Sequence, residues 1–243
     1  MNGYKETVMS YQNKICLIRQ PAGLGDIFFL QKVGHTYKSK GYDVVWPVIP
    51  QFTWISEYIK DFEFPSIDDE FPYKELYKSG RVFEDENVLF LPIQDADRMY
   101  PDKIMACKYR LVGLDYSNWM EYFNFTRNEE KENRLYHEIL GLEDGEEYCL
   151  VSRNYGSPPH SVKFNLNSNT KLKIVELDYH EGFTLLDWCK VIENATEMCI
   201  IDSSINFIID KLKPECKINM WSRRPNNWSE IDYMFNTKYN LMN

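Results

Sequence analysis

The sequence predicts an α/β protein with two parallel-sheet halves, and three observations carry this prediction. A chain of 243 residues is long enough for one large domain or two small ones. An apolar run of strand length, a turn of small residues and a helix occur together at residues 15–39 and again at residues 198–212. Hydrophobic residues make up 44% of the chain, which supplies a packed core and argues against disorder. The simplest division is into residues 1–125 and 126–243.

Charge and cysteine content exclude several classes of protein. A net charge of −9 argues against a surface that coats nucleic acid or an anionic membrane, but it allows a local basic pocket for one phosphate. The cysteines are scattered without a CxxC pair, which predicts buried thiols in a cytoplasmic protein without disulfides or zinc: Cys16, Cys107, Cys149, Cys189, Cys199 and Cys216. No apolar run approaches a membrane span, and the first residues lack a signal core.

The first predicted unit runs from a buried strand into a glycine turn and a helix. Lys14–Arg19 contains the apolar run of the strand, Gly23 and Gly25 lie in the turn, and the helix covers Asp26–Ser39. This order begins a nucleotide-type α/β unit. The dinucleotide fingerprint G-x-G-x-x-G is not satisfied, because Phe28 occupies its third glycine position, and no GxxxxGK[ST] loop occurs.

The remainder of the first half alternates strands with helices and one long connection. The periodicity and the turn residues predict a strand at Tyr42–Ile49, a helix at Thr53–Lys60, surface loops and small elements over Asp61–Glu86, a strand at Val88–Ile93 and a helix at Asp102–Val112. The acidic residues of the long connection lack the spacing of a calcium loop.

A helical linker region is predicted to join the two halves. It covers Asn118–Leu140 and ends at glycines 141 and 145. Three strands and an apolar tail that can dock as a helix complete the second half, at Tyr148–Val151, Lys173–Leu177, Cys216–Met220 and Asn227–Asn243 respectively.

The stretch around which the second half is organised reads as helix, strand, turn and helix. Thr184 is a plausible N-cap for a helix that ends near Ala195, and Met198–Ile201 suits a parallel strand covered on both faces. The next helix begins at Asp202-Ser203-Ser204, where free N–H groups and two hydroxyls form a candidate anion site. The alternative is that the two serines only cap the helix.

From Tyr148 to Leu212, the order GF-T-LLDW-x-x-VIE-x-A, strand, DSS, apolar helix resembles the C-terminal half of GT-B-type glycosyltransferases. It is most similar to the heptosyltransferase-like group and its phage and bacterial relatives, and the first half resembles them more loosely. The resemblance implies two Rossmann-like halves with a cleft between them and a terminal helix that can pack back on the first half. One departure is that the family's histidine after the DSS-like turn is replaced here by Phe207 or Ile208, so its role is not carried over.

In that family the strand–turn–helix holds the diphosphate of a nucleotide-sugar and the preceding loop lines the nucleotide pocket. With the residues that can reach the same cleft, this gives the candidate donor contacts. These residues are Arg153, Tyr155, Lys163, Phe183, Thr184, Asp202, Ser203 and Ser204. Arg153 can grip a phosphate with two parallel hydrogen bonds, or it is a surface charge at a strand end. Phe183 either stacks on a nucleobase or packs in the core, and Asp202 organises the turn rather than acting as a base.

The acceptor side is expected in the first glycine turn. In heptosyltransferase-like proteins the aspartate of a matching GD pair is the proposed general base, and GLGD here resembles it, so the resemblance implies that Asp26 is the base and that Gly23 and Gly25 line the cleft. The alternative is that Asp26 only caps its helix. Asp95 and Asp97 form the only Asp-x-Asp that follows a strand, and the two-halved organisation favours a scheme without a metal.

These features predict a metal-independent glycosyltransferase that moves a sugar from a nucleotide-sugar to an acceptor hydroxyl, with inversion by analogy to the family. It needs no cofactor, because the nucleotide-sugar is a substrate. A nucleotide-sugar epimerase and a non-catalytic nucleotide-sugar or glycan-binding module remain alternatives.

Overall fold

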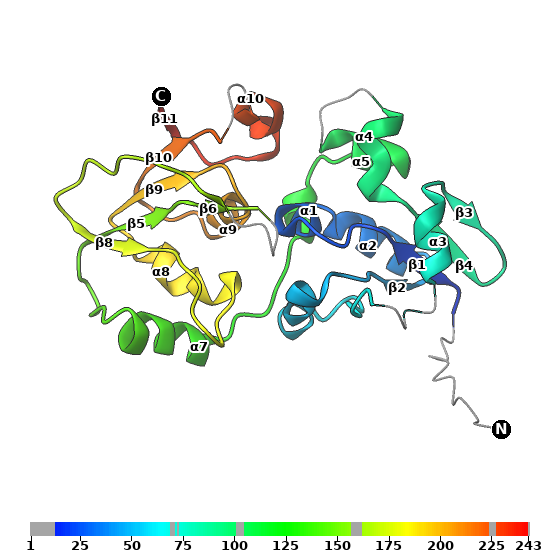
Figure 1. Cartoon of the computed structure of the whole chain (residues 1–243), viewed down its shortest axis with the longest axis horizontal. Helices are drawn as coiled ribbons and strands as arrows, with labels where there is room; N and C mark the ends of the chain where they lie inside the picture. Colours follow the sequence, from blue (N-terminus) through cyan, green and yellow to red (C-terminus); the bar gives the residue numbers. More distant parts are fainter. Residues whose placement is uncertain are drawn as a thin grey trace.

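The computed structural model describes residues 13–68, 71, 73–100, 105–156, 162–223 and 227–242. Two main β-sheets with helices around them lie side by side, one built from residues 15–91 and the other from residues 148–242 (Figure 1). The parts that carry these sheets are called the N-terminal half and the C-terminal half below. The predicted α/β architecture with two parallel-sheet halves is confirmed.

The sheet of the N-terminal half has the order β2-β1-β4-β3, with β3 antiparallel to β4 and the other neighbours parallel. All four residues of the central strand β1 are buried, as expected for a strand covered on both faces. Its strands are β1 (Ile15–Ile18), β2 (Asp43–Val45), β3 (Phe83–Glu84) and β4 (Val88–Leu91). Its helices are α1 (Leu24–Phe29), α2 (Gln31–Ser39), α3 (Lys74–Ser79), α4 (Ala96–Met99), α5 (Ala106–Leu111) and α6 (Trp119–Tyr122), with 3₁₀ segments at Pro50–Glu57 and Ile93–Asp95.

The predicted first helix is interrupted at Leu30, which divides it into α1 and α2. Residues 27–31 are consecutive and all fully buried. A straight helix cannot turn five consecutive side chains away from water unless it is covered on every side. The change of direction at Leu30 lies where the chain is packed between its own sheet and the C-terminal half, which Phe28 contacts through Phe207.

The expectation that residues 61–86 form surface loops was wrong for their aromatic side chains. Phe62, Phe64, Phe71 and Tyr77 are buried. Parallel bridges from Val45 to Glu63 and from Val48 to Ser66 extend the sheet beyond β2. Acidic residues alternate with aromatic ones at the start of this segment, so successive side chains point to opposite faces. The average polarity of the segment therefore gives no sign that its aromatic face packs in the core.

The main sheet of the C-terminal half has the order β11-β10-β9-β5-β8 and is parallel throughout. Its strands are β5 (Tyr148–Ser152), β8 (Lys173–Glu176), β9 (Glu197–Ile201), β10 (Lys217–Trp221) and β11 (Asn240–Met242), and β6 (Asn154–Tyr155) and β7 (Val162–Lys163) form a separate hairpin. The helices are α7 (Glu129–Asn133), which continues as a π-helical segment at Arg134–Ile139, α8 (Cys189–Glu193), α9 (Ile205–Leu212) and α10 (Asn227–Ile231), with 3₁₀ segments at Leu185–Trp188 and Asp232–Met234.

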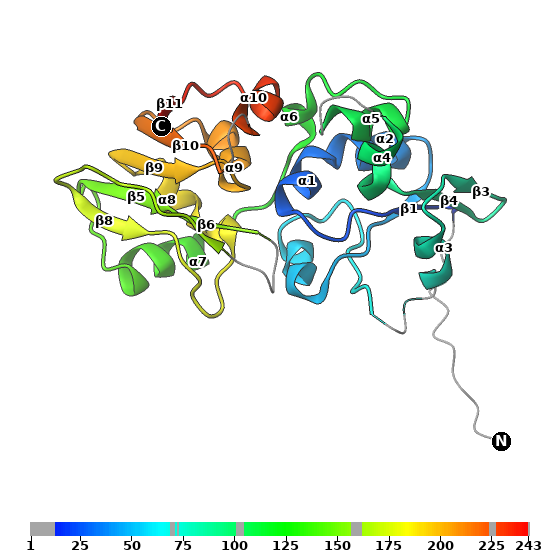
Figure 2. The same cartoon turned by 45° about the horizontal axis from the view of Figure 1, so that its top comes forward.

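The tail differs from the prediction of a docked helix. Only α10 and one 3₁₀ turn are helical, and the chain then forms β11, which adds a parallel edge strand beside β10 (Figure 2). At the end of the 3₁₀ turn the tail contacts α6, because Trp119 Nε1 donates a hydrogen bond to the carbonyl of Met234 over 2.9 Å.

One hydrophobic core passes through both halves. Phe28 stacks on Phe123 with 4.8 Å between ring centroids, and Trp119 meets Phe207 of α9 at 5.4 Å and Phe235 of the tail at 6.4 Å. These five rings are called the aromatic seam below. Apolar packing of this kind favours a fixed arrangement of the halves. Within the described residues, no helix is both long and apolar enough to cross a membrane.

Candidate functional site

Each sheet has a point where the strand order reverses. It lies between β1 and β4 in the N-terminal half and between β5 and β9 in the C-terminal half. Ligands of open parallel sheets bind beside such points, at the carboxyl ends of the strands. The predicted turn Gly23–Asp26 follows β1, Arg153 follows β5 and the turn 202–204 follows β9, so the sheets place all three sets at switch points.

The turn 202–204 is built on a fully buried carboxylate. Asp202 Oδ1 accepts hydrogen bonds from the backbone N–H of Arg223 at 2.8 Å and from its Nε at 2.9 Å. Ser203 donates its N–H to Asn206 Oδ1 at 2.8 Å, and Ser204 is the N-cap of α9. Among the described residues, none hydrogen-bonds to the hydroxyls of Ser203 or Ser204. Asp202 therefore holds the turn from inside while two hydroxyls lie at its surface.

Arg223 is a further cation at this turn and is not among the residues predicted from the sequence. It follows β10, its side chain is 30% exposed, and its guanidinium lies 5.4 Å from the centroid of the Tyr155 ring. A signal was available, because Arg223 comes just after a predicted strand and so had to lie at the same sheet edge. Tyr155, Asp202 and Arg223 are brought together, with the guanidinium held between a buried anion and an aromatic face.

The other two predicted cations lie apart from this cluster. Arg153 Nε donates to Glu176 Oε1 at 3.0 Å, and its Nη1 donates to the carbonyl of Leu166, so its side chain already has partners in β8 and in the segment between β7 and β8. Lys163 is exposed in the β6–β7 hairpin, opposite Asn154.

The loop between β8 and α8 is closed by a capping box. The N–H and hydroxyl of Thr184 donate to Asp187 Oδ2 at 2.7 and 3.1 Å, and the N–H of Asp187 donates back to the Thr184 carbonyl at 3.1 Å. Phe183 is half-buried, and the guanidinium of Arg134 lies 5.6 Å from its ring centroid. Thr184 is thus the N-cap that the sequence indicated, and its hydroxyl is occupied by capping.

In the N-terminal half, the candidate base Asp26 forms an ion pair with a buried lysine. Lys108 Nζ lies 2.7 Å from Asp26 Oδ1 and donates to Gln20 Oε1 at 2.6 Å. Lys108 is 8% exposed, and it comes from α5, far along the chain. The sequence carried no signal for it, because only tertiary packing distinguishes this lysine from others on helices.

Two glycines of the turn make close approaches possible. Gly23 has φ +83°, and a Cβ on it would lie 2.2 Å from Asp26 Oδ2, so the carboxylate occupies the space of a side chain at residue 23. A Cβ on Gly25 would lie 2.6 Å from Cε2 of Phe207. Gly25 therefore lets α1 pack directly on α9, which brings the turn that holds Asp26 next to the helix that begins at the turn 202–204.

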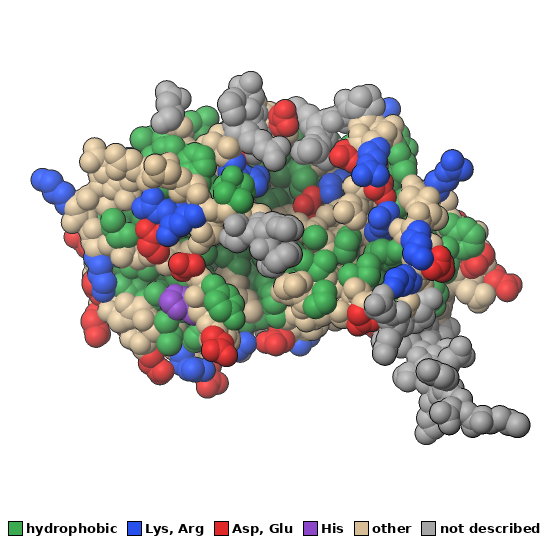
Figure 3. Space-filling model, viewed as in Figure 1, with side chains coloured by type: hydrophobic (Ala, Val, Ile, Leu, Met, Phe, Trp, Pro, Cys, Tyr) green, Lys and Arg blue, Asp and Glu red, His purple; other side chains and the backbone are tan. Residues whose placement is uncertain are grey.

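The Asp-x-Asp pair lies at the same edge of the N-terminal sheet. Asp95 forms ion pairs with Arg19 and Arg98, the latter over 3.4 Å. Across the described ranges, no three His, Cys, Asp or Glu side chains gather as a metal site would require. Five of the six cysteines are buried, and Cys216 is half-buried. Acidic and basic side chains are interspersed over the face seen in Figure 3.

No family model matches the chain, and no curated protein matches it. Several solved structures are similar to it. A glycosyl transferase family 9 protein from Veillonella parvula is 11% identical, with a TM-score of 0.49 over 95% of this chain and 85% of its own. The iron-containing dodecameric glycosyltransferase TibC from enterotoxigenic E. coli is 7% identical, with a TM-score of 0.49. The match covers 95% of the present chain and 62% of the TibC chain.

The E. coli heptosyltransferase WaaC with ADP is 11% identical, with a TM-score of 0.39 over 86% of each chain. Identities this low, with TM-scores below 0.5, say nothing about which reaction the present chain performs.

Proposed function

We propose that this chain is a glycosyltransferase that moves a sugar from a nucleotide-sugar to an acceptor hydroxyl. The observation that carries the proposal is the packing of Gly25 on Phe207, which puts the candidate base turn of one half beside the candidate diphosphate turn of the other. The sequence resemblance between residues 148–212 and GT-B-type enzymes supports the same assignment.

In the proposed reaction the nucleotide-sugar lies along the carboxyl ends of β10, β9 and β5. The hydroxyls of Ser203 and Ser204 and the guanidinium of Arg223 contact the diphosphate, and Tyr155 holds Arg223 in place. Charge-assisted hydrogen bonds to a phosphate contribute roughly 1.5–3 kcal/mol each. Positive charge at this position stabilises the departing nucleoside diphosphate, which is the role that a metal ion fills in other glycosyltransferases.

Asp26 acts on the acceptor. Its carboxylate takes the proton of the acceptor hydroxyl while the acceptor oxygen forms a bond to the anomeric carbon and the bond from that carbon to the diphosphate oxygen breaks. A direct displacement of this kind inverts the anomeric configuration. Lys108 keeps the carboxylate oriented through its bond to Oδ1. The free thiols of the chain fit a reducing compartment, and we assign the protein to the cytoplasm.

The ion pair between Asp26 and Lys108 also favours a second candidate, a module that binds nucleotide-sugars without turnover. The Asp26 carboxylate already has a partner at Oδ1, as a carboxylate with a structural role would. In this second candidate the C-terminal half keeps the donor site, and Asp26 serves only to cap α1.

Thermal unfolding with a panel of nucleoside diphosphates and nucleotide-sugars tests the donor site. We expect one nucleotide to raise the melting temperature selectively, with the same rise in EDTA, because a ligand that binds only the folded state stabilises it by mass action. No rise with any of them at millimolar concentration would overturn the proposal. A rise that EDTA abolishes would contradict the metal-independent scheme.

A further inference from the structure

A buried hydrogen bond joins the two halves beside the linker. Tyr58 Oη donates to Asp187 Oδ1 over 2.6 Å, and the two side chains are 2% and 0% exposed. Tyr58 follows the 3₁₀ helix Pro50–Glu57 of the N-terminal half, whereas Asp187 lies in the 3₁₀ segment Leu185–Trp188 that leads into α8. Burial, and then the bond to Asp187, raise the pKa of Tyr58 to about 12, so the phenol stays a donor near neutral pH.

The same carboxylate closes the loop that precedes α8. While Oδ1 of Asp187 accepts from Tyr58, Oδ2 accepts from the N–H and the hydroxyl of Thr184. This loop, residues 180–184, follows β8 and reaches the carboxyl edge of the sheet, where the nucleotide is proposed to bind. One buried group thus connects the loop to the opposite half of the molecule.

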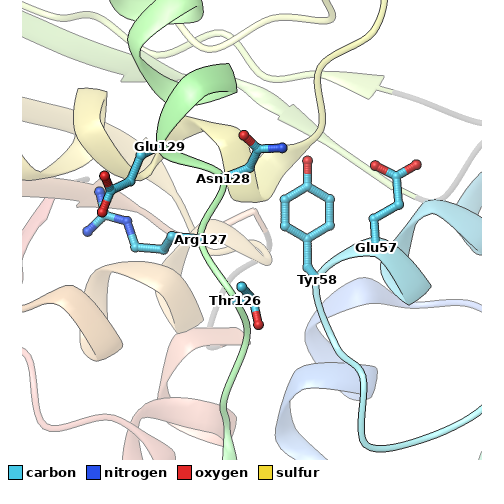
Figure 4. Close-up of a pocket in the computed structure, with 6 residues that line it drawn as sticks. All are labelled: Glu57, Tyr58, Thr126, Arg127, Asn128 and Glu129. Carbon is cyan, nitrogen blue, oxygen red and sulfur yellow. The ribbon is translucent and has the colours of Figure 1, made fainter.

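Tyr58 is also attached to the linker between the halves. Its carbonyl accepts a hydrogen bond from the N–H of Thr126 over 2.8 Å, and Lys131 Nζ lies 3.5 Å from its hydroxyl and 3.1 Å from Glu57 Oε2. A pocket of about 360 Å³ lies beside it, lined by Glu57, Tyr58, Thr126, Arg127, Asn128 and Glu129. Figure 4 shows the Tyr58 hydroxyl pointing across this junction, away from the cyan segment that carries the residue and toward the C-terminal half.

We infer that Tyr58 is a positioning residue that makes the order of the 180–184 loop depend on how the two halves are arranged. A change in their relative orientation moves Tyr58 with the N-terminal half and withdraws a donor from Asp187. The carboxylate is fully buried and cannot replace that donor with bulk water, so its bonds to Thr184 change with it. The part of this inference that concerns the nucleotide rests on the proposed function; the mechanical coupling does not.

Hydrogen exchange at the Thr184 amide, measured without ligand, tests the coupling directly in Tyr58→Phe. The substitution keeps the ring and removes only the hydroxyl. We expect the Thr184 amide to exchange about tenfold faster. Its acceptor is the Asp187 carboxylate, and the substitution removes the hydrogen bond that Tyr58 donates to the other oxygen of that carboxylate. Tyr148→Phe is a matched control, since the Tyr148 hydroxyl is buried and donates to the Val191 carbonyl over 2.7 Å within the C-terminal half.

Faster exchange at Thr184 in Tyr58→Phe but not in Tyr148→Phe supports the inference. Unchanged exchange, or an equal increase in both variants, overturns it. Asp187→Asn is the second variant if Tyr58→Phe does not fold. A neutral amide has a single acceptor oxygen and cannot serve Tyr58 and Thr184 together, so the same acceleration is expected.

The nucleotide found by thermal unfolding is then titrated into the parent and into Tyr58→Phe. We expect its dissociation constant to rise several-fold in the variant, with no change in Tyr148→Phe. If no nucleotide binds the parent, the proposed function fails while the exchange result still decides the coupling. If the nucleotide binds the parent and Tyr58→Phe equally well, the order of the 180–184 loop does not affect donor binding. The part of the inference that concerns the nucleotide is then wrong.

Discussion

The two sheet edges that face each other carry ion pairs of opposite arrangement. In the C-terminal half the acid is hidden and the base is presented: Asp202 is 0% exposed, and its partner Arg223 is 30% exposed. In the N-terminal half the base is hidden and the acid is presented: the side chain of Lys108 is 10% exposed, and that of Asp26 is 25% exposed. In each of these two pairs the exposed partner balances the charge of the buried one.

This difference indicates how the two edges divide a reaction. An exposed guanidinium anchored by a buried carboxylate is suited to bind an anion, whereas an exposed carboxylate anchored by a buried ammonium is suited to accept a proton. In each pair the buried partner fixes the position of the exposed one. If the asymmetry is functional, substitutions at the two edges should have different effects on turnover and on nucleotide binding.

Asp26→Asn removes the exposed carboxylate of the N-terminal edge. We expect turnover to fall by roughly 10²-fold or more, the usual contribution of a general base, while nucleotide binding stays within a factor of two. Product formation and nucleotide titration are measured on the same preparation. Asp95→Asn is the matched control, because Asp95 also forms an ion pair at this sheet edge, in its case with Arg19. An equal loss in both variants would assign the effect to disturbed packing rather than to proton transfer.

Gly25→Ala should push α1 away from α9 and so separate the sheet edges of the two halves. Its Cβ would lie 2.6 Å from a Phe207 ring carbon, and that ring belongs to the aromatic seam and has little freedom to move. We expect a loss of about 1–3 kcal/mol in the free energy of unfolding in urea, together with weaker nucleotide binding. Gly34→Ala offers a comparison within one half, since its Cβ would lie 2.7 Å from Phe62. Weaker binding in Gly34→Ala would show that loss of stability alone explains the result.

Arg223→Lys should weaken the basic side while keeping its charge. A lysine cannot reproduce the planar fork, so we expect the dissociation constant of the nucleoside diphosphate to rise about tenfold. Calorimetric titration measures it. Arg153→Lys is predicted to change binding much less, because Glu176 already engages Arg153. If Arg153→Lys weakened binding more than Arg223→Lys, the diphosphate contact would be assigned to Arg153, as predicted from the sequence.

Mild acid should affect the N-terminal half through His35. Burial lowers the pKa of His35 below its usual value, so the unfolded chain binds the proton more readily. The stability that the neutral ring maintains is therefore lost as pH falls through the unfolded value of about 6.5 toward the lowered one. Urea unfolding at pH 7.5 and 5.5 should show a smaller loss for His35→Gln than for the parent. Equal losses in the two proteins would exclude His35 as the cause.

Much of the fold was readable from local sequence, and particular residues explain why. The apolar runs in β1, β4, β5 and β9 are short and continuous, as buried parallel strands require. Thr184 was identifiable as an N-cap because its side-chain type and the apolar spacing after it agree. The strand β11 was not predicted, since Asn240–Met242 has no pattern of its own and pairs only because β10 lies beside it.

The candidate site was readable only where it lies at strand ends. The turns at Gly23–Asp26 and at 202–204 follow strands, so topology alone assigned them to sheet edges. Lys108 lies in the middle of a helix and becomes part of the site through tertiary packing, which no local pattern encodes. The partners of Arg153 and Thr184 were hidden for the same reason, because Glu176 and Asp187 look like ordinary surface acids in the sequence.

The aromatic seam has a consequence for how the protein reaches its folded state. Phe28 and Phe207 lie far apart in the sequence, yet they meet where the halves join. Contacts of such long range form late, since the loop-closure entropy must be overcome before they give any stabilisation. During synthesis the N-terminal half emerges first and must expose Phe28 and Phe123 to water until α9 has been made. Until then these rings form an exposed apolar surface on the incomplete chain, and surfaces of this kind favour aggregation.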